Sequence, residues 1–276
     1  MAPPKYFTIT QPQDYTAHVE INRAEKMNAF FEEMWLELGT IFTTLSTDPT
    51  IRVIILSGAG PKAFTTGLDV KAATQTLLPT TDDLDAARKA THLRRHITSF
   101  QDCISAIERC EKPVIAAMHG FALGLAVDIA TAADIRLCAA ETQFAVKEVD
   151  IGLAADIGTL SRLPKVVGSF GWVKEVALTA RVFGAEEALR VGFVSGVFGD
   201  KEAVVKGALE LAGVIAAKSP VAVLGTKEIL NWSRDRRVED GLRYTSVWNS
   251  AALQTADVSA ALLSGIQKRK PTFEKL

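Results

Sequence analysis

The sequence predicts an α/β protein whose C-terminal quarter is entirely helical. Short apolar runs typical of buried strands alternate with segments in which apolar residues recur at helical spacing, up to about residue 200. Beyond that point the helical spacing continues and the strand pattern does not return. We therefore expect a strand-and-helix core at residues 1–200 and a helical region at residues 201–276.

Apolar alternation and turn residues place the elements of the N-terminal part. The run Ile-Arg-Val-Ile-Ile-Leu is the clearest buried strand, and a turn rich in glycine ends it. Taken in order, the expected elements are strands at 6–10 and 18–21, a helix at 28–45, a strand at 51–56, a loop at 62–69 that opens a helix, a polar insertion at 74–83 and a long helix at 84–109.

Strand-like runs and helical patterns alternate more quickly after Pro113. Strands are expected at 114–118, 135–139, 144–146 and 194–198, and helices at 123–133, 160–167, 172–179 and 186–191. The helical region should then contain helices at 201–218, 221–232, 241–253 and 257–268.

Composition excludes several classes of protein. The chain has 276 residues, a net charge of -1 and 48% apolar residues, which is typical of a soluble globular protein and argues against a nucleic-acid surface. Cys103, Cys110 and Cys138 form no Cys-x-x-Cys pair, so we expect reduced, buried thiols. The first residues show neither a signal core nor an arginine-rich amphipathic pattern.

Three further features have ordinary explanations. Residues 113–133 are apolar enough to suggest a membrane span, but His119, Asp128 and glycines interrupt them. We expect a buried strand, turn and helix there and no membrane span. His92 and His96 are four residues apart on a helix, yet no further ligand stands near them in the sequence, so we expect no metal site. His119 is expected to pack at a turn rather than act as a base.

Three acids stand in apolar, glycine-rich sequence and need an explanation. Asp128, Glu148 and Asp156 have few basic residues around them. A carboxylate in apolar surroundings is costly unless it is paired or used, and burial raises its pKa toward neutrality. Such acids suit proton exchange with a substrate. Asp150 lies beside Lys147 and is expected to face outward or to be paired.

Two glycine-bearing turns each lead into an expected helix. They lie at residues 63–68 and 123–126. Free backbone N–H groups at a helix start carry partial positive charge, and two that converge would form an oxyanion hole suited to a thioester enolate. The alternative is two plain helix starts in which glycine permits close packing. Together with the acids, the turns favour proton transfer next to a carbonyl.

The sequence resembles the crotonase, or enoyl-CoA hydratase/isomerase, family over residues 6–273. No single motif is specific, but their combination is. The motifs that carry the resemblance are Ile21-Asn22-Arg23 with Asn28-Ala29, the segment Lys62-Ala63-Phe64-Thr65-Thr66-Gly67-Leu68-Asp69, the segment Lys112-Pro113-Val114-Ile115-Ala116 leading to His119-Gly120-Phe121-Ala122, and Ala132-Ala133-Asp134-Ile135-Arg136.

The resemblance implies a fold, a partner and a set of contacts. The implied fold is a spiral of ββα turns with a C-terminal helical trimerisation region, assembled as trimers or as hexamers made of two trimers. The implied ligand is an acyl-CoA thioester, so the substrate itself carries coenzyme A and no separate cofactor is expected. Its carbonyl would accept hydrogen bonds from the backbone N–H groups of Leu68 and Leu125. The remaining substrate contacts would come from Arg23, Lys26, Ala29, Ala63, Thr66, Gly67 and Asp69.

The acids distinguish reaction types within the family. Hydratases carry glutamates at the positions of Asp128 and Glu148 and glycine at that of Asp156, whereas simple enoyl-CoA isomerases generally keep the acid matching Glu148. Dienoyl-CoA isomerases carry all three acids, as this chain does. The segment 147–165 is also close to their signature. The resemblance thus implies a shift of 3,5-dienoyl-CoA to 2,4-dienoyl-CoA, with Glu148 at C2 and Asp156 at C6 or the reverse, and Asp128 polarising the pocket.

Two other hypotheses about function are consistent with the sequence. One is a simple Δ3-Δ2-enoyl-CoA isomerase or an enoyl-CoA hydratase. Another is a non-catalytic binding protein of the same fold. Leu125 favours the hypothesis of a non-catalytic binding protein, because the family usually has glycine at this position and a Cβ restricts how closely a ligand can approach the backbone.

The C-terminus bears on the compartment. Dienoyl-CoA isomerases often end in the peroxisomal address Ser-Lys-Leu, and this chain ends in Glu274-Lys275-Leu276. The resemblance implies a peroxisomal protein, with mitochondrion and cytoplasm as alternatives.

Overall fold

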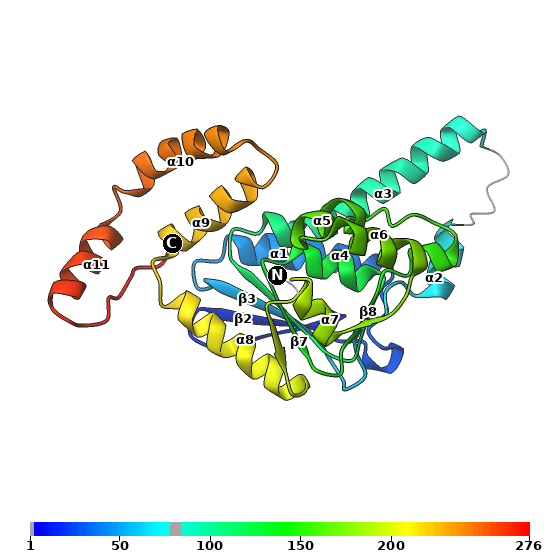
Figure 1. The fold of residues 1–276 in the computed structure, drawn as a ribbon, viewed down its shortest axis with the longest axis horizontal. Coiled ribbons are helices and arrows are strands. Elements are labelled where there is room, and N and C mark those ends of the chain that lie inside the picture. Colours follow the sequence, from blue (N-terminus) through cyan, green and yellow to red (C-terminus); the bar gives the residue numbers. More distant parts are fainter. Residues whose placement is uncertain (1–2, 78–83) are drawn as a thin grey trace.

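Two sheets form the centre of the computed structural model, which describes residues 3–77 and 84–276. The larger sheet has the order β1-β2-β3-β5-β7-β10, in which β1 runs antiparallel to β2 and the other neighbours are parallel (Figure 1). Its strands are β1 Phe7–Gln13, β2 Thr16–Ile21, β3 Val53–Gly58, β5 Val114–Met118, β7 Ile135–Ala139 and β10 Gly196–Phe198.

The smaller sheet has the order β4-β6-β8-β9, and its strands are β4 Ala63–Thr65, β6 Phe121–Leu123, β8 Gln143–Ala145 and β9 Phe183–Gly184. The strand pairs β3–β4, β5–β6 and β7–β8 each place one strand in the larger sheet and the next in the smaller one. Helices follow each pair along the chain. This repeat of two strands and a helix is the spiral that the sequence implied, and it confirms the predicted fold class.

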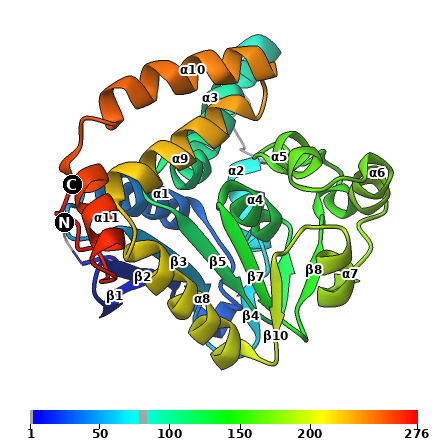
Figure 2. The same cartoon turned by 60° about the vertical axis from the view of Figure 1, so that its left-hand side comes forward.

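Helices cover both faces of the larger sheet (Figure 2). The main core forms against α1 Glu32–Ser46, α3 Ala86–Arg109 and α4 Leu125–Ala132, with fully buried side chains such as Phe30, Phe42 and Phe64. A second core forms where α8 Lys201–Ala216 packs four small residues, three of them alanines, onto the opposite face. The helix α8 therefore belongs to the packed body, although it lies beyond residue 200.

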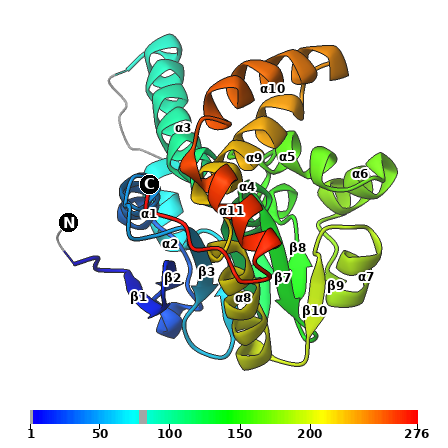
Figure 3. The ribbon, with the colours of Figure 1, turned by 90° about the vertical axis from the view of Figure 1, so that its left-hand side faces the viewer.

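The remaining helices belong either to the body or to the C-terminal tail, which comprises α9 to the C-terminus. Those of the body are η1 Ala24–Lys26, α2 Val70–Leu77, η2 Glu148–Ile151, α5 Thr159–Val166, α6 Phe170–Thr179 and α7 Ala185–Arg190. Those of the tail are α9 Pro220–Ser233, α10 Val238–Ala252 and α11 Ala256–Ile266. The tail reaches out from the body and turns back, so that the C-terminus lies near the base of α9 (Figures 1 and 3).

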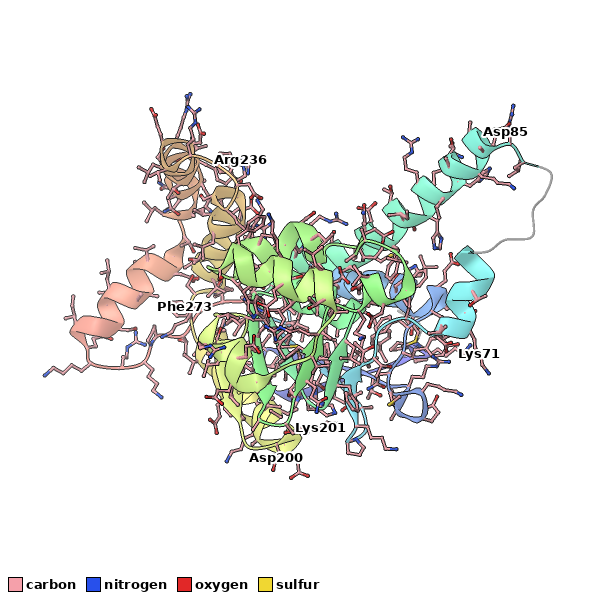
Figure 4. All side chains as sticks on the ribbon, turned by 45° about the vertical axis from the view of Figure 1, so that its right-hand side comes forward. Lys71, Asp85, Asp200, Lys201, Arg236 and Phe273 are labelled. Carbon is pink, nitrogen blue, oxygen red and sulfur yellow. The ribbon has the colours of Figure 1, made fainter. Side chains whose placement is uncertain are left out.

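Two buried cations attach the tail to the body. Lys227 Nζ, on α9, donates to Asp134 Oδ2 at 2.7 Å and to the Lys112 carbonyl at 3.0 Å. Arg52 donates to the carbonyls of Phe273 and Glu274. These bonds hold Phe273, which is labelled in Figure 4, and with it the end of the chain against the body. A buried ammonium or guanidinium group is tolerated because each is paired or hydrogen-bonded.

Several predicted boundaries were wrong for identifiable reasons. The helix expected from residue 28 begins at Glu32, because Asn28 adopts a φ of 57° and its side chain bonds to the Ala59 and Ala63 carbonyls. The loop expected at 62–69 contains the strand β4. The helix expected from residue 123 begins at Leu125, because Leu123 still pairs in the smaller sheet.

Short elements were also missed. The strand β1 extends beyond residue 10, where the predicted strand ends, to Gln13. The elements η1, β6, η2 and β9 were not predicted, because such short segments carry no periodic signal. The insertion expected at 74–83 begins inside α2, and its residues 78–83 lie outside the described part of the chain.

Within the described residues, no single helix is both long and apolar enough to cross a membrane. The pair α8 and α9 meets that criterion only when the two are taken together, and a bend of 109° separates them. The apolar segment at 113–133 forms β5, β6 and α4, so the predicted strand and helix are present, but a second strand, β6, lies between them where only a turn was expected.

The buried pair between α9 and the sheet predicts a large stability effect. Replacing Lys227 with alanine leaves the Asp134 carboxylate without its cation, which should lower the free energy of unfolding by about 3–5 kcal/mol. Urea denaturation at fixed protein concentration measures this. The matched control is Lys206→Ala on exposed α8 surface, expected within about 0.5 kcal/mol of wild type. Equal stability of both variants would contradict the role of the pair.

Candidate active site

Two backbone turns meet at the junction of β4 and α4. A Cβ placed on Gly67 would lie 3.0 Å from the Leu123 carbonyl oxygen and 3.5 Å from the Leu125 nitrogen, and one on Gly124 would lie 4.0 Å from Gly67 Cα. Both glycines have positive φ, 92° and 54°, which other residues rarely adopt. The two turns predicted from sequence therefore pack directly against each other.

The backbone of Leu68 forms an isolated parallel bridge with Phe30. Flanking bonds join Phe30 N to the Gly67 carbonyl at 2.8 Å and Asp69 N to the Phe30 carbonyl at 2.7 Å. Because Leu68 is the central residue of this parallel bridge, its own N–H faces away from Phe30. It has no acceptor among the described residues, so it is free to bind a ligand oxygen.

The N–H of Leu125 opens α4. As the first helical residue it has no intrahelical acceptor, and none is present elsewhere in the described chain. The helix start adds partial positive charge. The leucine side chain is only 3% exposed and packs in the main core, so the Cβ at this position is accommodated inside the protein.

An ion pair braces the turn that carries Leu68. Arg23 Nη1 donates to Asp69 Oδ2 at 2.9 Å and to the Ala29 carbonyl at 2.7 Å, and this guanidinium holds the pKa of Asp69 below its usual range. Asn28, which the sequence analysis quoted without a role, ties the same region together through two carbonyls. These residues position the turn.

The other expected substrate contacts lie around the same turn. Ala29 and Ala63 are buried, with exposures of 9% and 1%, so their backbone rather than their methyl groups would face a ligand. Lys26 is exposed at the end of η1, and Thr66 N donates to the Met27 carbonyl at 3.1 Å. Their contact with substrate stays a prediction.

Glu148 lies against the second glycine turn. Its Oε1 would be 3.4 Å from a Cβ on Gly124, while its buried Oε2 has no hydrogen-bond partner. Burial raises the pKa of Glu148, and the nearby Asp156 charge raises it further. A carboxyl group with a free oxygen and a raised pKa is poised to take up a proton.

Asp128 is fully buried one turn into α4. Its Oδ1 accepts a hydrogen bond of 2.6 Å from Thr159 N, at the start of α5. Burial raises the pKa of Asp128 to about 7, the Glu148 charge adds to the shift, and Thr159 and Arg162 oppose it. The side chain therefore caps α5 and joins it to α4, a structural link that the sequence analysis did not foresee.

Asp156 lies on the segment between η2 and α5. The residue as a whole is exposed, but its carboxyl group is partly shielded from solvent. This desolvation raises the pKa of the carboxyl group, and His96 on α3 lowers it. Gln101 Nε2, also on α3, donates to the Asp156 carbonyl. The structure thus brings all three acids to one region.

Sequence reasoning missed three neighbours of the acids. Thr159 and Arg162 were quoted only as part of a signature, and Gln101 gave no signal beyond its place on a helix. Arg162 forms a 2.9 Å ion pair with Glu108. Their roles follow from packing between elements distant in sequence.

Other expectations about single residues can be checked directly. Asp150 pairs with Lys147, as predicted. His119 is buried at its turn, with Nε2 2.8 Å from the Gly60 carbonyl oxygen, also as predicted. Within the described part of the chain, no group of three or more histidine, cysteine or acidic residues is placed to hold a metal ion.

The geometry defines a class of chemistry. Two free backbone N–H groups at one junction can stabilise an oxyanion, and a carboxyl group of raised pKa lies beside them. These groups are the ones that a protein needs to transfer a proton at a carbon atom next to a carbonyl group.

Family comparison makes the assignment specific. The model of the enoyl-CoA hydratase/isomerase family matches residues 13–275. The chain belongs to this family, which confirms the resemblance.

Curated relatives share much of the sequence. The chain is 46% identical to the human mitochondrial Δ(3,5)-Δ(2,4)-dienoyl-CoA isomerase over 271 residues, which cover 97% of this chain and 82% of the relative. It is 44% identical to the peroxisomal enzyme of that name from Arabidopsis thaliana, over 94% of this chain and 92% of the relative. Among solved structures, the enoyl-CoA hydratase of Bacillus anthracis superposes with a TM-score of 0.87 at 26% identity, covering 98% and 99% of the two chains.

The raised pKa of Asp128 predicts a pH-dependent stability. The folded state holds this proton more tightly than the unfolded chain, so stability falls as pH rises from about 4 to about 7 and stays low above. Asp128→Asn keeps an oxygen acceptor for Thr159 and removes the charge. At pH 8 it should be more stable than wild type by roughly 1–4 kcal/mol, with the gain vanishing near pH 4.

Urea denaturation across this pH range measures the difference. The control is Asp150→Asn, which removes an exposed carboxylate and should show no gain of this size. A difference between Asp128→Asn and wild type that does not change with pH would contradict the assignment.

Proposed function

We propose that this protein isomerises 3,5-dienoyl-CoA to 2,4-dienoyl-CoA by transferring protons at C2 and C6. The observation that carries the proposal is that three acids, Asp128, Glu148 and Asp156, lie in one region, with Glu148 against the glycine turn that precedes the free N–H of Leu125. The relatives over 40% identical that bear this activity in their names support it. The acyl-CoA substrate supplies coenzyme A, and no further cofactor is proposed.

The thioester end of the substrate would sit at the glycine junction. Its carbonyl oxygen accepts from the N–H groups of Leu68 and Leu125, which stabilise the negative charge of the enolate. C2 is bonded to that carbonyl carbon, so the base that acts on C2 must lie close to the junction. Glu148, whose Oε1 faces Gly124, meets this condition and takes the C2 proton.

The far end of the diene needs a proton donor. When the C2 proton leaves, the electron pair moves through the diene and C6 gains a proton, giving the 2,4-isomer with no net change in atoms. Asp156 lies on the segment beyond η2, next to α3, and its raised pKa lets it hold a proton to deliver. Asp128 stays buried and caps α5 by accepting a hydrogen bond from Thr159 N. In this mechanism it supports the site and does not contact the substrate.

Self-association is part of the proposal. The tail helices carry large apolar side chains at the surface of the single chain, with exposures such as 67% for Leu262 and 79% for Ile266. Exposed apolar surface of this kind marks an interface. We propose a trimer, or a hexamer of two trimers, in which neighbouring subunits cover these helices.

The proposed compartment is the peroxisome. The peroxisomal name of the plant relative supports it. The mitochondrial names of the mammalian relatives make the mitochondrion the alternative.

Removing either proton-transfer acid should abolish most of the activity. Glu148→Gln and Asp156→Asn keep size and hydrogen bonding but cannot exchange a proton, so each should lower kcat by at least ~100-fold. Appearance of conjugated-diene absorbance from 3,5-dienoyl-CoA measures this. Asp150→Asn is the control and should retain full turnover. Full activity in either acid variant would remove that residue from the mechanism.

Hydration should be much slower than isomerisation. Asp156 stands where hydratases keep glycine, and Asp128 is one methylene shorter than their glutamate, so a nucleophilic water is poorly placed. Misplacement by about 1 Å costs on the order of 100-fold. The kcat/KM for 3,5-dienoyl-CoA should therefore exceed that for hydration of 2-enoyl-CoA by at least ~100-fold at matched chain length. Equal or faster hydration would favour the hydratase reading.

The apolar surface of α11 should be needed for assembly. Replacing Leu262 and Ile266 together with glutamate places two charges in the proposed interface and should convert the oligomer to smaller species. Sedimentation velocity of both proteins shows the change. Lys206→Glu, on exposed α8 surface, should leave the assembly intact. An unchanged oligomer in the double variant would refute this use of α11.

A further inference from the structure

An arginine of α5 folds back over the start of its own helix. Arg162 N donates to the Gly158 carbonyl at 2.9 Å and closes the first turn of α5. Side chains of a helix lean toward its N-terminus, and the Arg162 guanidinium accordingly lies against Gly158. A Cβ on Gly158 would overlap Arg162 Nη1, and would lie 3.3 Å from Arg162 Cζ and 3.8 Å from Asp128 Oδ1. The guanidinium, the helix start and the buried acid are therefore immediate neighbours.

Two residues of α3 hold this guanidinium. Arg162 Nε and Nη2 donate to Glu108 Oε2 at 3.0 and 2.9 Å, and Nη2 also donates to Ser105 Oγ at 2.8 Å. Ser105 and Glu108 are three residues apart and share one face of α3. Gln101, four residues before Ser105, lies on the same face and donates to the Asp156 carbonyl. One face of α3 thus contacts both ends of the stretch from Asp156 to Arg162.

The tail reaches the same carboxylate. Arg234, which follows α9, donates from Nη1 to Glu108 Oε1 at 2.5 Å, while Arg162 bonds to the other oxygen. The next residue, Asp235, pairs with Lys165 near the end of α5. The turn between α9 and α10 is therefore joined by ion pairs to both α3 and α5 (Figure 2).

Glu108 is suited to be shared between two cations. Its side chain is only 19% exposed, and that of Arg162 only 11%. Burial raises the pKa of Glu108, but Arg162 and Arg234 together outweigh burial and hold this pKa below its usual range. Glu108 therefore stays ionised near neutral pH, and removing either arginine leaves a partly buried carboxylate short of one partner.

The segment that carries Asp156 ends at this helix start. Asp156 stands two residues before Gly158, and η2 lies at the other end of the segment. A shift of the α5 start would therefore move the acid that serves C6, and misplacement by about 1 Å costs on the order of 100-fold in rate. Glu148 lies on η2 against the Gly124 turn, so the C2 half of the reaction depends on other contacts.

We propose that Arg162 is a positioning residue for Asp156, and that the tail helps to hold it in place through the shared Glu108 carboxylate and Arg234. This inference rests on the proposed function and deepens it, because it couples the proton donor at C6 to the helical tail. Arg162 acts through the start of α5 and does not contact the reacting atoms.

Kinetics of the intact chain test the positioning role. Arg162→Met keeps the length of the side chain and removes its charge and its bonds to Ser105 and Glu108. It should lower kcat for conjugated-diene formation by about 10-fold to 100-fold and leave KM within about 2-fold, because the glycine junction that binds the thioester is untouched. Arg234→Met should lower kcat by about 3-fold to 10-fold, since Glu108 keeps one arginine. In the Asp156→Asn background, Arg162→Met should cause no further loss, because the acid that it positions is already gone.

Amide hydrogen exchange tests the coupling without any substrate. Thr159 N donates to Asp128 Oδ1, so the exchange of this amide reports how often the start of α5 opens. A peptide covering residues 153–161 should exchange at least ~3-fold faster than wild type in both Arg162→Met and Arg234→Met.

Arg236→Met is the matched control. Arg236 stands in the same turn as Arg234 but stacks on Trp232, and it has no acidic partner among the described residues. Its removal should leave both kcat and the exchange of residues 153–161 as in wild type. An equal effect of this control would show a general disturbance of the tail and overturn the proposal.

Three further outcomes decide the inference. Wild-type kcat and exchange in Arg162→Met and Arg234→Met would overturn it, as would a loss from Arg162→Met that is undiminished in the Asp156→Asn background. Arg234→Met alters a side chain that is 33% exposed, so it keeps the test decisive if Arg162→Met does not fold. Wild-type protein that forms no conjugated diene would refute the proposed function, and the exchange measurement would still decide whether the tail holds the start of α5.

Discussion

The site depends on the close approach of two backbone turns at Gly67 and Gly124. A side chain on Gly67 would lie 3.0 Å from the Leu123 carbonyl oxygen and would hold the turns apart. With glycine at both positions, the free N–H groups of Leu68 and Leu125 can be directed at one ligand oxygen. The Arg23–Asp69 pair and Asn28 hold the first turn, and the start of α4 holds the second.

The three acids differ because their surroundings differ. Burial raises the pKa of all three, but each has a different partner. Asp128 accepts a helix-start N–H and serves the structure, Glu148 keeps one oxygen without a partner, and Asp156 faces α3. In the proposed mechanism, carboxyl groups thus serve for support, proton abstraction and proton delivery, because desolvation and hydrogen bonding set the proton affinity of each group separately.

The tail combines firm attachment with exposed apolar surface. Lys227 and Arg52 tie its two ends to the body through buried hydrogen bonds, so α9 and the last residues are held in place. Between these anchors, α10 and α11 present leucine, valine and isoleucine side chains outward. Exposed apolar surface of this kind marks an interaction site, which supports the proposed self-association.

Some features could be read from local sequence. The strands at 114–118 and 135–139 were predicted with their observed bounds, because short apolar runs, interrupted in the second strand only by Arg136, indicate buried strands of a parallel sheet. The pairing of Asp150 with Lys147 and the packed state of His119 were also evident from near neighbours. The acids were recognised as a set because carboxyl groups in apolar sequence are rare enough to require a cause.

By itself the sequence determined the α/β class, the helical tail, the two glycine turns and the three acids, since residue composition and spacing along the chain are sufficient to identify each of them. Only the tertiary structure decided which groups meet. It brought Gly67 to Leu125, Asp128 to Thr159 and Gln101 to Asp156, contacts that join residues 31 to 58 positions apart. No local pattern encodes such contacts, because they arise from how helices and strands pack into one core, and that packing fixed the separate surroundings of each acid.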